Sequence, residues 1–401
     1  MRAAIRLTTA GESHGPCVTA IVEGIPSGLA MSAADIDREL ARRQVGYGRG
    51  GRMQIERDRV EIKGGVRHGV SLGYPICLVV ENRDWANWQG EMAAEAPAAG
   101  WVSERVVTVP RPGHADLAGR AKFDHRDMRN VLERASARET VARVAAGAIC
   151  KCLLAEVGVE VHGQTLGIGG IETARAETGE AAWDKVEASD LRCADEPAAA
   201  QMRQRIDEAR EAGDSLGGVF EVVAVGVPAG LGSYASWEER LDGRLGQAML
   251  SIPGIKAVEI GLGFRAAGLP GSRVQDPIAL RPDAGDEEWP FARGSNNAGG
   301  LEGGVTNGEP VVLRAAMKPI PTLMRPLASV DVASGEATEA HAERSDVCAV
   351  PAACVVAEAM AALVLASAVC EKFGGDTVED LTAAHRAYMR RLRGRWDAQP
   401  G

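Results

Sequence analysis

GESHGPCVTAIVEGIPSGL at residues 11–29 and GDSLGGVFEVVAVGVPAGL at residues 213–231 are two copies of one pattern. Each copy begins with glycine, an acidic residue and serine, continues as an alternating strand, and ends in Gly-(Ile/Val)-Pro-x-Gly-Leu. Such self-similarity is the sequence signature of an internal repeat. The pattern therefore predicts that two parts of the chain fold alike.

The similarity extends outward from the two copies in the same order. Each copy is followed by an amphipathic helix, expected over residues 33–43 and 237–249. Further along, GGVRHG with a Pro-Ile strand (residues 64–76) corresponds to GGVTNG with a Pro-Val strand (residues 303–311). Two matches in one order predict two related halves that face each other across a pseudo-two-fold axis.

We expect the halves to cover about residues 1–130 and 213–330. Between them, residues 127–158 lack proline and carry apolar residues at helical spacing, which predicts one long central helix. Residues 171–212, rich in Ala, Glu and Arg, are expected to form a peripheral lobe without obvious chemistry. Since proline suits the first turn of a helix, a second buried helix is expected to open a C-terminal helical part at residues 351–390.

Short alternating strands beside helices, with breaks such as Gly-Ile-Pro-Ser-Gly, predict an α/β (α+β) fold. We expect a sandwich with largely antiparallel sheets in one domain over residues 1–401. The chain has no regular βαβ rhythm and no GxGxxG motif after a first strand. A Rossmann domain is therefore not expected.

The composition points to a small ligand. The net charge of −10 over 401 residues argues against nucleic acid or an anionic membrane as the main partner. Arginines are nevertheless dense at residues 42–52 and 134–138. Arginine clusters in an acidic protein favour a polyanionic small molecule as the ligand.

No signal peptide, membrane span or metal site is expected. The N-terminus MRAAIRLTTAGES has no long apolar core. The most apolar stretch, residues 351–369, is interrupted by Glu358, which favours a buried core helix over a membrane helix. The eight cysteines are scattered without metal spacing, so we interpret them as reduced thiols of a cytoplasmic protein.

His14 distinguishes the two copies of the repeat. The first copy has GESHG at residues 11–15 where the second has GDSLG at residues 213–217. The glycine, acid and serine occur in both copies and are interpreted as architectural. A lone histidine is more often structural, but its presence in only one copy favours a functional role for His14.

His114 lies in a second candidate loop, RPGHAD at residues 111–116. One interpretation is a tight turn whose Asp116 caps the following helix. The other uses the imidazole, which titrates near neutral pH and can donate a proton to a leaving group or a cofactor nitrogen. Two such loops in one chain predict a pair of general acids.

The glycine-rich segment RRQVGYGRGGR at residues 42–52 is a candidate anion site. Guanidinium groups bind carboxylate and phosphate bidentately, and glycine lets a ligand approach the backbone. Arg42 is interpreted as part of a solvated face. The arginines separated by glycines are less easily explained in that way.

Three further segments add charged groups. Arg134 and Arg138 are one turn apart and are expected to share a helix face, in an ion network with the neighbouring glutamates or as a second anion clamp. KPIPT at residues 318–322 is a rigid extended loop led by a lysine, and ERSD at residues 343–346 offers arginine, hydroxyl and acid. Either could be a surface loop, and together they would supply a cation pair and a candidate base.

Over nearly its whole length the chain resembles the chorismate synthase family. The segments that carry the resemblance are GESHGP, RRQVGYGRGGRM, RPGHADL, LERASARET, GGVFEVVAVGVPAGLGS, NNAGGLEGGVTNGEP, MKPIPTL and ERSDVCAVPAA. Long motifs in one order make the match specific. The resemblance implies a β-α-β sandwich assembled as a homotetramer, in agreement with the two expected halves.

The resemblance also implies a reaction: a 1,4-anti elimination of phosphate from 5-enolpyruvylshikimate 3-phosphate, which gives chorismate. In the family this reaction requires reduced FMN without net oxidation, and NADPH serves indirectly as the reductant. An external flavin reductase and a cytoplasmic location are therefore expected. The alternatives are a bifunctional form that reduces its own flavin with NADPH, and a non-catalytic homologue that binds polyanions.

By motif, His14 resembles the histidine that protonates the departing phosphate, His114 the one that protonates the reduced flavin, and Asp346 the acid that assists proton removal. The positions expected to bind substrate or another anion such as NADP are Ser13, Arg43, Arg49, Arg52, Arg111 and Arg138. The positions expected to contact flavin are Arg134, Ala135, Ser136, Pro253, Gly254, Gly303, Lys318, Pro319, Ile320, Pro321, Thr322 and Arg344.

At Pro253-Gly254 the chain departs from the family pattern, which often has Asn-Ala or Gln-Ala there. Proline has no backbone N–H, so a flavin contact through that amide is not expected. Ala135 also stands where serine is frequent, and His125 is an additional imidazole without an assigned role. None of these departures removes a candidate acid, base or arginine.

Overall fold

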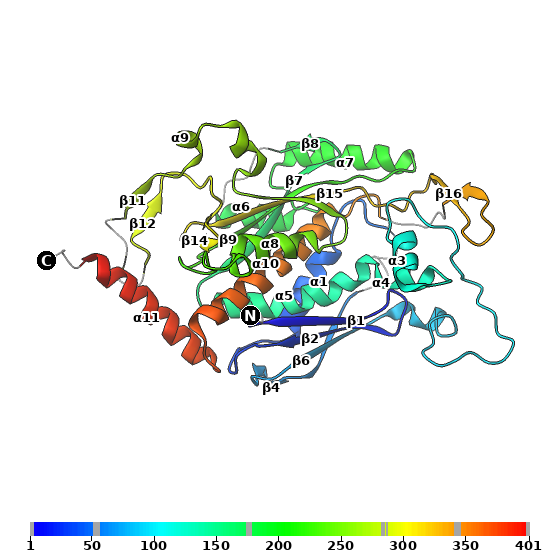
Figure 1. The fold of residues 1–401 in the computed structure, drawn as a ribbon, viewed down its shortest axis with the longest axis horizontal. Coiled ribbons are helices and arrows are strands. Elements are labelled where there is room, and N and C mark those ends of the chain that lie inside the picture. Colours follow the sequence, from blue (N-terminus) through cyan, green and yellow to red (C-terminus); the bar gives the residue numbers. More distant parts are fainter. Residues whose placement is uncertain are drawn as a thin grey trace.

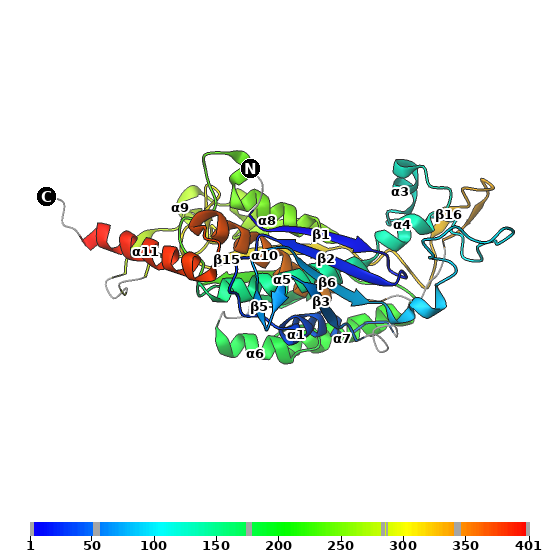
Figure 2. The same cartoon turned by 90° about the horizontal axis from the view of Figure 1, so that it is seen from below.

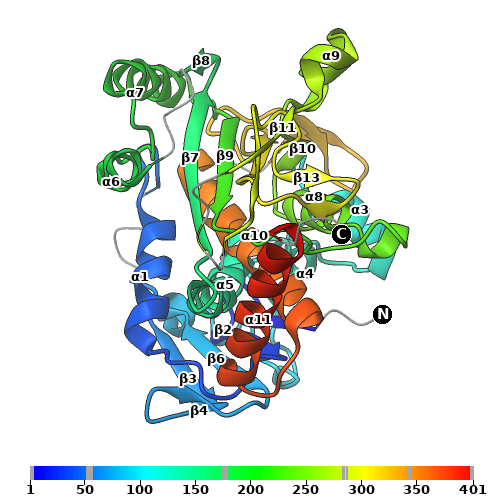
Figure 3. The same ribbon diagram turned by 90° about the vertical axis from the view of Figure 1, so that its left-hand side faces the viewer.

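The structure is a computed structural model, and it describes residues 4–50, 57–173, 179–281, 285, 288–340 and 346–397. Two antiparallel sheets enclose a layer of helices (Figures 1 and 3). This arrangement confirms the expected α/β (α+β) sandwich.

The first sheet comes from the N-terminal part of the chain. Its strands are β1 (Arg6–Gly11), β2 (Cys17–Glu23), β3 (Val60–Gly64) and β6 (Ile76–Glu81). They lie in the order β1-β2-β6-β3, and each neighbouring pair is antiparallel (Figure 2). Alternate residues of β2 and β6 are buried, as in a sheet that covers a core with one face.

The second sheet has five strands. They are β7 (Glu160–Ile168), β8 (Ile171–Glu172), β9 (Gly218–Val225), β10 (Ile255–Ile260) and β15 (Val311–Met317). Their order is β10-β15-β9-β7-β8, again with antiparallel neighbours.

The two sheets repeat one topology. The repeated sequence forms β2 in one sheet and β9 in the other, and each pairs with the strand of the second sequence match, β6 or β15. β1 lies beside β2 as β7 lies beside β9, and β3 lies beside β6 as β10 lies beside β15. Helix α1 (Ala33–Gln44) follows β2 just as α8 (Leu241–Leu250) follows β9. The duplication inferred from the sequence is therefore confirmed.

The second half begins earlier than residue 213. Because β7 is the equivalent of β1, the second sheet starts at Glu160, and the segment between β7 and β9 is an insertion within this half. The insertion contains β8, α6 (Glu180–Ala188) and α7 (Glu196–Glu211) and forms the expected lobe. β1 and β7 share no residue pattern, so the repeat in the sequence did not reveal this boundary.

Two apolar helices, α5 (Thr140–Ala155) and α10 (Val350–Phe373), lie between the sheets (Figure 3). α5 packs on β2 and β6, and α10 packs on β7 and β9. By length and composition α10 could cross a membrane, but 94% of its most apolar window is buried inside the protein. α10 is therefore the buried core helix expected after Pro351.

Alanine in place of Gly147 is expected to destabilise the contact between α5 and α10. A Cβ there would overlap with the Cα and Cβ of Ala359, and would lie 2.9 Å from its carbonyl oxygen. Overpacking costs about 1–3 kcal/mol, which exceeds the gain of about 1 kcal/mol in helix propensity. Thermal unfolding would measure the net loss.

Gly246 of α8 provides the matched control, because a Cβ there meets nothing within 4 Å. Gly246→Ala is expected to raise the melting temperature slightly. A Gly147→Ala protein as stable as Gly246→Ala would contradict the proposed overlap.

The single helix expected over residues 127–158 is interrupted. It consists of α4 (Arg129–Arg134), the 3₁₀ turn η2 (Ala137–Glu139) and α5. Ser136 is extended, with φ −71° and ψ 148°, and its Oγ accepts a hydrogen bond from the Arg138 N–H at 3.3 Å. Serine side chains compete in this way with helical hydrogen bonds, so the apolar periodicity did not reveal the break.

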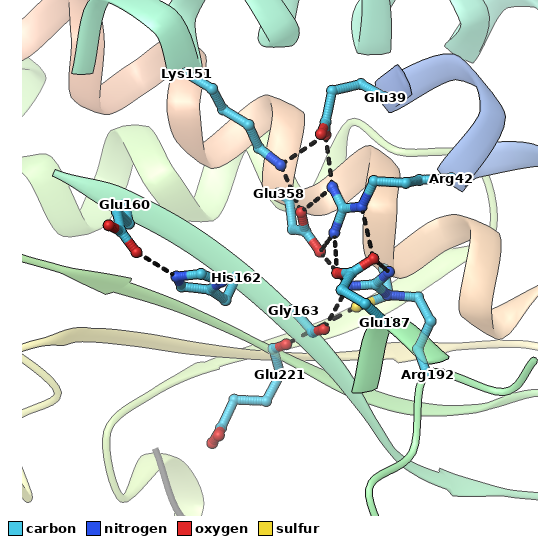
Figure 4. Close-up of polar contacts among 11 residues, drawn as sticks. Glu39, Arg42, Lys151, Glu160, His162, Gly163, Glu187, Arg192, Glu221 and Glu358 are labelled. Atoms are coloured by element: carbon cyan, nitrogen blue, oxygen red, sulfur yellow. Dashed lines mark hydrogen bonds and ion pairs between the residues drawn. The ribbon is translucent and has the colours of Figure 1, made fainter. Parts of the chain in front are cut away.

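Glu358 of α10 is fully buried and ties three parts of the chain together (Figure 4). Its carboxylate accepts hydrogen bonds from Arg42 of α1 at 2.8 and 3.0 Å, from Lys151 of α5 at 2.6 Å, and from Arg192 of the lobe at 2.7 Å. Burial opposes its ionisation, but these three cations hold the pKa of Glu358 well below its usual range.

Arg42 belongs to this buried network and not to a solvated face, so that expectation was wrong. Its side chain is 17% exposed and also pairs with Glu39 at 2.6 Å and with Glu187 at 2.5 Å. The decisive partner, Glu358, lies far along the chain and is identified only by the fold.

The other described elements are shorter or lie at the edges of the sandwich. They are β4 (Val66–Arg67), β5 (Val70–Ser71), η1 (Arg83–Asn87), α3 (Asp116–Phe123), η3 (Trp237–Glu239), η4 (Gly263–Gly268), α9 (Gly271–Val274), β11 (Ile278–Leu280), β12 (Phe291–Arg293), β13 (Leu301–Glu302), β14 (Val305–Thr306), β16 (Ala328–Val330), β17 (Ala337–Glu339) and α11 (Val378–Asp397).

Candidate active site

His14 lies in the turn between β1 and β2, where a carboxylate holds its ring. Nδ1 lies 2.9 Å from Oε1 of Glu133, whose Oε2 accepts a hydrogen bond from the His14 backbone N–H at 2.8 Å. Glu133, on α4, is 2% exposed and also accepts a hydrogen bond from Arg129 at 3.2 Å. Burial opposes ionisation of Glu133, but its contacts with His14 and Arg129 lower the pKa of the carboxyl group.

Trp88, just after η1, covers the ring of His14. The two rings are stacked with 3.9 Å between their centroids and an interplanar angle of 20°. The indole N–H donates to Asp84 at 2.8 Å, and the guanidinium of Arg105 lies 3.9 Å from the indole ring. The stack leaves the His14 side chain 16% exposed, so this imidazole is partly withdrawn from water.

His114 is held in the same manner by other residues. Its Nδ1 lies 2.6 Å from Oδ1 of Asp116 and 3.1 Å from Nη2 of Arg111. Arg111 also donates to Asp116 at 2.9 Å and to Oγ1 of Thr322 at 3.1 Å. Burial opposes ionisation of Asp116, but hydrogen bonds from His114 and Arg111 hold the pKa of this carboxyl well below its usual range.

Asp116 does not cap α3, contrary to one interpretation of its loop. It is the first residue of α3, and the residue at the N-cap position, Ala115, makes no side-chain cap. The carboxylate of Asp116 instead accepts hydrogen bonds from the backbone and side chain of Arg111. The carboxylate therefore stabilises the loop that contains His114 and not the N-terminus of α3.

Residues 318–322 connect the His114 loop to the second half of the fold. The backbone N–H of Lys318 donates to the carbonyl of Gly254 at 2.9 Å. The ammonium of Lys318 donates to the carbonyl of Gly113, next to His114. The expected flavin-contact segment therefore lies between the His114 loop and the turn after α8.

The equivalent turns of the repeat have diverged around a common serine. Ser13 accepts a hydrogen bond at 3.1 Å from the hydroxyl of Ser136, which lies between α4 and η2. Ser215 donates to the carbonyl of Ile320 at 2.7 Å. Leu216, at the position equivalent to His14, packs against the hydrophobic core. The serine anchors both turns, whereas the imidazole contacts occur only in the first.

Arg43 and Arg138 share one buried carboxylate. Asp58 accepts hydrogen bonds from Arg43 at 2.8 Å and from Arg138 at 2.5 Å. All three residues are buried. Burial lowers the pKa of Arg43, and the nearby charges of Arg49 and Arg138 lower it further against the opposing effect of Asp58. The cluster therefore has an excess of positive charge.

Arg49 adds a third guanidinium beside this pair. It forms an ion pair with Asp346 at 2.8 Å, and Asp346 also accepts a hydrogen bond from the Gly50 N–H at 2.7 Å. The Nε atoms of Arg43 and Arg49 are buried and have no hydrogen-bond partner among the residues that the structure describes. Buried N–H groups are normally satisfied, so an anion bound here would complete the site.

Asn82 and Ser136 join the arginine cluster to the His14 turn. Asn82 accepts a hydrogen bond from Nε of Arg138 at 2.7 Å and donates to two backbone carbonyls of the His14 turn at 2.7 and 3.1 Å. Ser136 accepts from the Arg138 backbone and donates to Ser13. The candidate acid and the candidate anion site are therefore one connected structure.

A hollow of about 340 Å³ lies beside Ser136. Its lining residues are Arg134, Ala135, Ser136, Glu139, Arg143 and Pro253. It brings together four of the positions expected to contact flavin, from two distant segments of the chain. Its two arginines and one glutamate give the lining a net positive charge, which suits a ligand that carries phosphate.

The sequence and the fold match proteins of one family. The chorismate synthase family model matches residues 5–370. A chorismate synthase of Desulforudis audaxviator (strain MP104C) is 57% identical over 390 residues, which cover 97% of this chain and 98% of that protein. Another, from Moorella thermoacetica (strain ATCC 39073 / JCM 9320), is 56% identical over 391 residues, with coverage of 97% and 100%.

A crystal structure of a chorismate synthase matches the fold with a TM-score of 0.77 and 42% sequence identity, over 97% of this chain and 98% of the other. The chain belongs to the chorismate synthase family. It is therefore an enzyme, a lyase.

Pro253 and Gly254, the expected departure from the family pattern, suit a tight turn. They are the central residues of the turn between α8 and β10, closed by a hydrogen bond from the Ile255 N–H to the Ile252 carbonyl at 3.2 Å. Gly254 has φ of 85°. Proline followed by a glycine of positive φ is typical of a type II turn, so this wall of the hollow has an apolar ring in place of an N–H.

Arg134 and Arg138 do not share a helix face, because the chain turns at Ser136. Arg138 enters the buried cluster, whereas Arg134 is exposed, lines the hollow and donates to backbone carbonyls of β1. The next turn forms its own ion pair, Glu139 with Arg143 at 2.8 Å. The segment from Arg134 to Arg138 thus contributes to both the hollow and the buried arginine cluster.

One of the expected positions that the structure describes is not joined to the site. Gly303 lies at the exposed tip of the β13–β14 hairpin and is not among the residues that line the hollow in the described part of the chain. Arg52 and Arg344 lie outside the described residues.

Besides Glu133, which was expected only in an ion network next to Arg134 and Arg138, three residues that hold the site were not among the expected positions: Asp58, Asn82 and Trp88. None of them lies at a repeated or regularly spaced position. Charge balance was the available signal for Asp58, since clustered buried arginines require a carboxylate near them. The roles of Asn82 and Trp88 depend on contacts between distant segments, which no local pattern shows.

Proposed function

We propose that the protein eliminates phosphate from 5-enolpyruvylshikimate 3-phosphate in a 1,4-anti reaction that gives chorismate, with reduced FMN as cofactor. The observation that carries the proposal is the connection of the His14 turn to a buried arginine cluster through Asn82 and Ser136. Such a site combines cations that bind a phosphate ester with an imidazole that can protonate it. Membership of the family supports the same reaction.

The substrate in this proposal carries two carboxylates and a phosphate. Arg43, Arg49 and Arg138 are the proposed binding groups, because two of them have buried N–H atoms that an anion would satisfy. Ser13 and Arg111 are proposed to complete the anion contacts. Arginine suits the task, since its planar fork binds carboxylate and phosphate bidentately.

The proton steps are assigned to residues with fixed positions. His14, as an imidazolium, donates its proton to the oxygen of the departing phosphate, which keeps the electron pair of the broken C3–O bond. Asp346, paired with Arg49, is the proposed acid–base group that assists removal of the C6 proton. His114 is held by Asp116 and Arg111. Its imidazole is proposed to hold a proton at the part of the site that residues 318–322 form.

The lining of the hollow fits a flavin. Arg134, Ser136 and Pro253 would hold it, together with residues 318–322, which bind the carbonyl of Gly254 beside Pro253. When bound, reduced FMN supplies electron density to the substrate as the C3–O bond breaks. Gly303 and Arg344 remain proposed flavin contacts through their motifs.

We further propose that the enzyme is a cytoplasmic homotetramer and receives reduced FMN from a separate reductase that uses NADPH. Anaerobic mixing of the protein with FMN and NADPH tests the last point. The oxidised flavin absorbance is expected to persist. Bleaching without an added reductase would show the bifunctional form instead.

Anaerobic turnover tests the function itself. The protein, chemically reduced FMN and 5-enolpyruvylshikimate 3-phosphate are expected to release phosphate and form chorismate in equal amounts. Omission of the flavin should abolish both signals. If neither product appears with reduced FMN, the protein is a polyanion-binding homologue and not a lyase of this substrate.

Arg49→Ala is expected to raise the KM for the substrate about 10-fold or more, because a hydrogen bond to a charged group contributes about 1.5–3 kcal/mol. The rise in KM should exceed the fall in kcat. Steady-state kinetics under anaerobic conditions would measure both constants.

Arg59→Ala is the control, since the Arg59 side chain is 67% exposed and pairs with Asp37 outside the site. Its KM should equal that of the unaltered enzyme. An unchanged KM in Arg49→Ala would exclude this arginine from substrate binding.

A further inference from the structure

Both histidines of the site bind a carboxylate through Nδ1, and each carboxylate also accepts a hydrogen bond from an arginine. His14 uses Glu133 with Arg129, and His114 uses Asp116 with Arg111. The two groups come from unrelated segments of the chain. This shared arrangement shows which ring nitrogen the protein holds.

We propose that Glu133 is the positioning residue of His14: it binds Nδ1–H and so makes Nε2 the nitrogen that delivers the proton. The direction of proton transfer rests on the proposed function. The contact between Glu133 and Nδ1 does not, and it can be tested separately.

The chemistry of the two groups sets the tautomer. An ionised carboxylate only accepts hydrogen bonds, so the nitrogen that faces Glu133 carries a hydrogen. When His14 is an imidazolium, both nitrogens carry hydrogens. Transfer breaks the Nε2–H bond and forms an O–H bond on the departing phosphate, and the ring becomes the neutral Nδ1–H tautomer. Water returns the proton in the next cycle.

Glu133 is suited to this role because it accepts from three donors at once. They are the His14 backbone N–H, the His14 ring and Arg129. A glutamine amide offers one acceptor oxygen, and its NH₂ group only donates. Glu133→Gln therefore keeps the size of the side chain but must leave at least one of the three donors facing another donor.

The charges around His14 also favour a carboxylate. Two cations lie near the ring of His14. Arg129 is on α4 with Glu133, and both Arg129 and Arg105 lie over the indole of Trp88, which stacks on His14. Removal of the Glu133 charge leaves the imidazolium beside two cations.

¹⁵N NMR of the full-length enzyme, labelled in histidine, would test the proposal directly, with the His14 signals assigned by their loss in His14→Ala. The neutral ring of the unaltered enzyme should show a protonated Nδ1. Glu133→Gln should reduce this tautomer. Glu133→Asp, which retains the charge, should restore part of the Nδ1–H signal.

Turnover provides the second measurement. Glu133→Gln is expected to lower kcat about 10-fold or more, as part of the contribution of a general acid, with little change in KM. Glu133→Asp should recover part of that loss. Glu371→Gln is the control: this carboxylate pairs with Arg244 and Ser367 away from the site, and its loss should leave kcat unchanged.

An unaltered His14 spectrum in Glu133→Gln would overturn the proposal, and so would a kcat equal to that of the unaltered enzyme. Equal losses in the Gln and Asp variants would show a need for the shape of glutamate and not its charge, which also contradicts it. If the unaltered enzyme releases no phosphate, the proposed function fails, while the NMR comparison still decides whether Glu133 holds Nδ1.

Discussion

Alanine in place of His14 is expected to slow phosphate release about 100-fold or more, the usual scale for the loss of a general acid. The ring is stacked under Trp88 and held by a buried glutamate, so alanine at this position removes the proposed proton donor from both contacts. His114→Ala is expected to cause a loss of similar size. Anaerobic single-turnover assays of phosphate and chorismate would measure both.

Binding should largely survive in both variants, because the arginine cluster and the hollow are built from other residues. The control is His68→Asn, which replaces an exposed imidazole in the turn between β4 and β5. It should turn over normally. A histidine whose alanine variant also turns over at nearly the normal rate would lose its assigned role.

Glu358→Gln is expected to lower the free energy of unfolding by about 3–5 kcal/mol, the range observed when one partner of a buried ion pair is removed. The substitution leaves Arg42, Lys151 and Arg192 close together inside the protein without the carboxylate that all three share. Because these cations come from α1, α5 and the lobe, the effect should extend to the whole fold. Denaturant unfolding followed by circular dichroism would measure it.

Glu208→Gln is the matched control, since Glu208 forms an exposed pair with Arg205 on α7. Exposed pairs contribute about 0–1 kcal/mol. If the two variants unfold at the same denaturant concentration, the buried network does not stabilise the fold in the way described.

The same network predicts how stability depends on pH. Against the effect of burial, hydrogen bonds and charge from Arg42 and Arg192 lower the pKa of Glu187 to about 2, and the pKa of Glu358 is also lowered. Carboxyls with a depressed pKa stabilise the fold fully above their unfolded value of about 4.3, and this contribution is lost as the pH falls towards 2. Glu358→Gln should show a weaker loss of stability over this range.

The repeat made most of the fold predictable. Its two copies correctly predicted that β2 and β9 are equivalent strands followed by helices, and the second match correctly related β6 to β15. The first strand of the second sheet was not predicted, because β7 has no sequence likeness to β1. The break at Ser136 was also missed, since a side-chain cap leaves the apolar spacing of the flanking segments intact.

The sequence predicted the residues of the candidate site that lie in motifs. It did not predict the residues that hold them in position. His14, His114 and the arginines lie in recognisable sequence motifs. Their partners Glu133 and Asp58, by contrast, bind groups that the fold brings from other segments. A carboxylate of this kind is defined by its position in the fold and not by its neighbours in the sequence. A single sequence therefore does not distinguish it from an acidic residue on the surface.

The apolar helix α10 has a consequence during synthesis of the chain. Before it is enclosed, this segment has the length and hydropathy of a membrane-spanning helix. A carboxylate well inside such a segment raises the free energy of insertion by about 2.5–3.5 kcal/mol. Glu358 thus disfavours delivery of the nascent helix to the lipid bilayer until α1, α5 and the lobe supply the three cations that bind it.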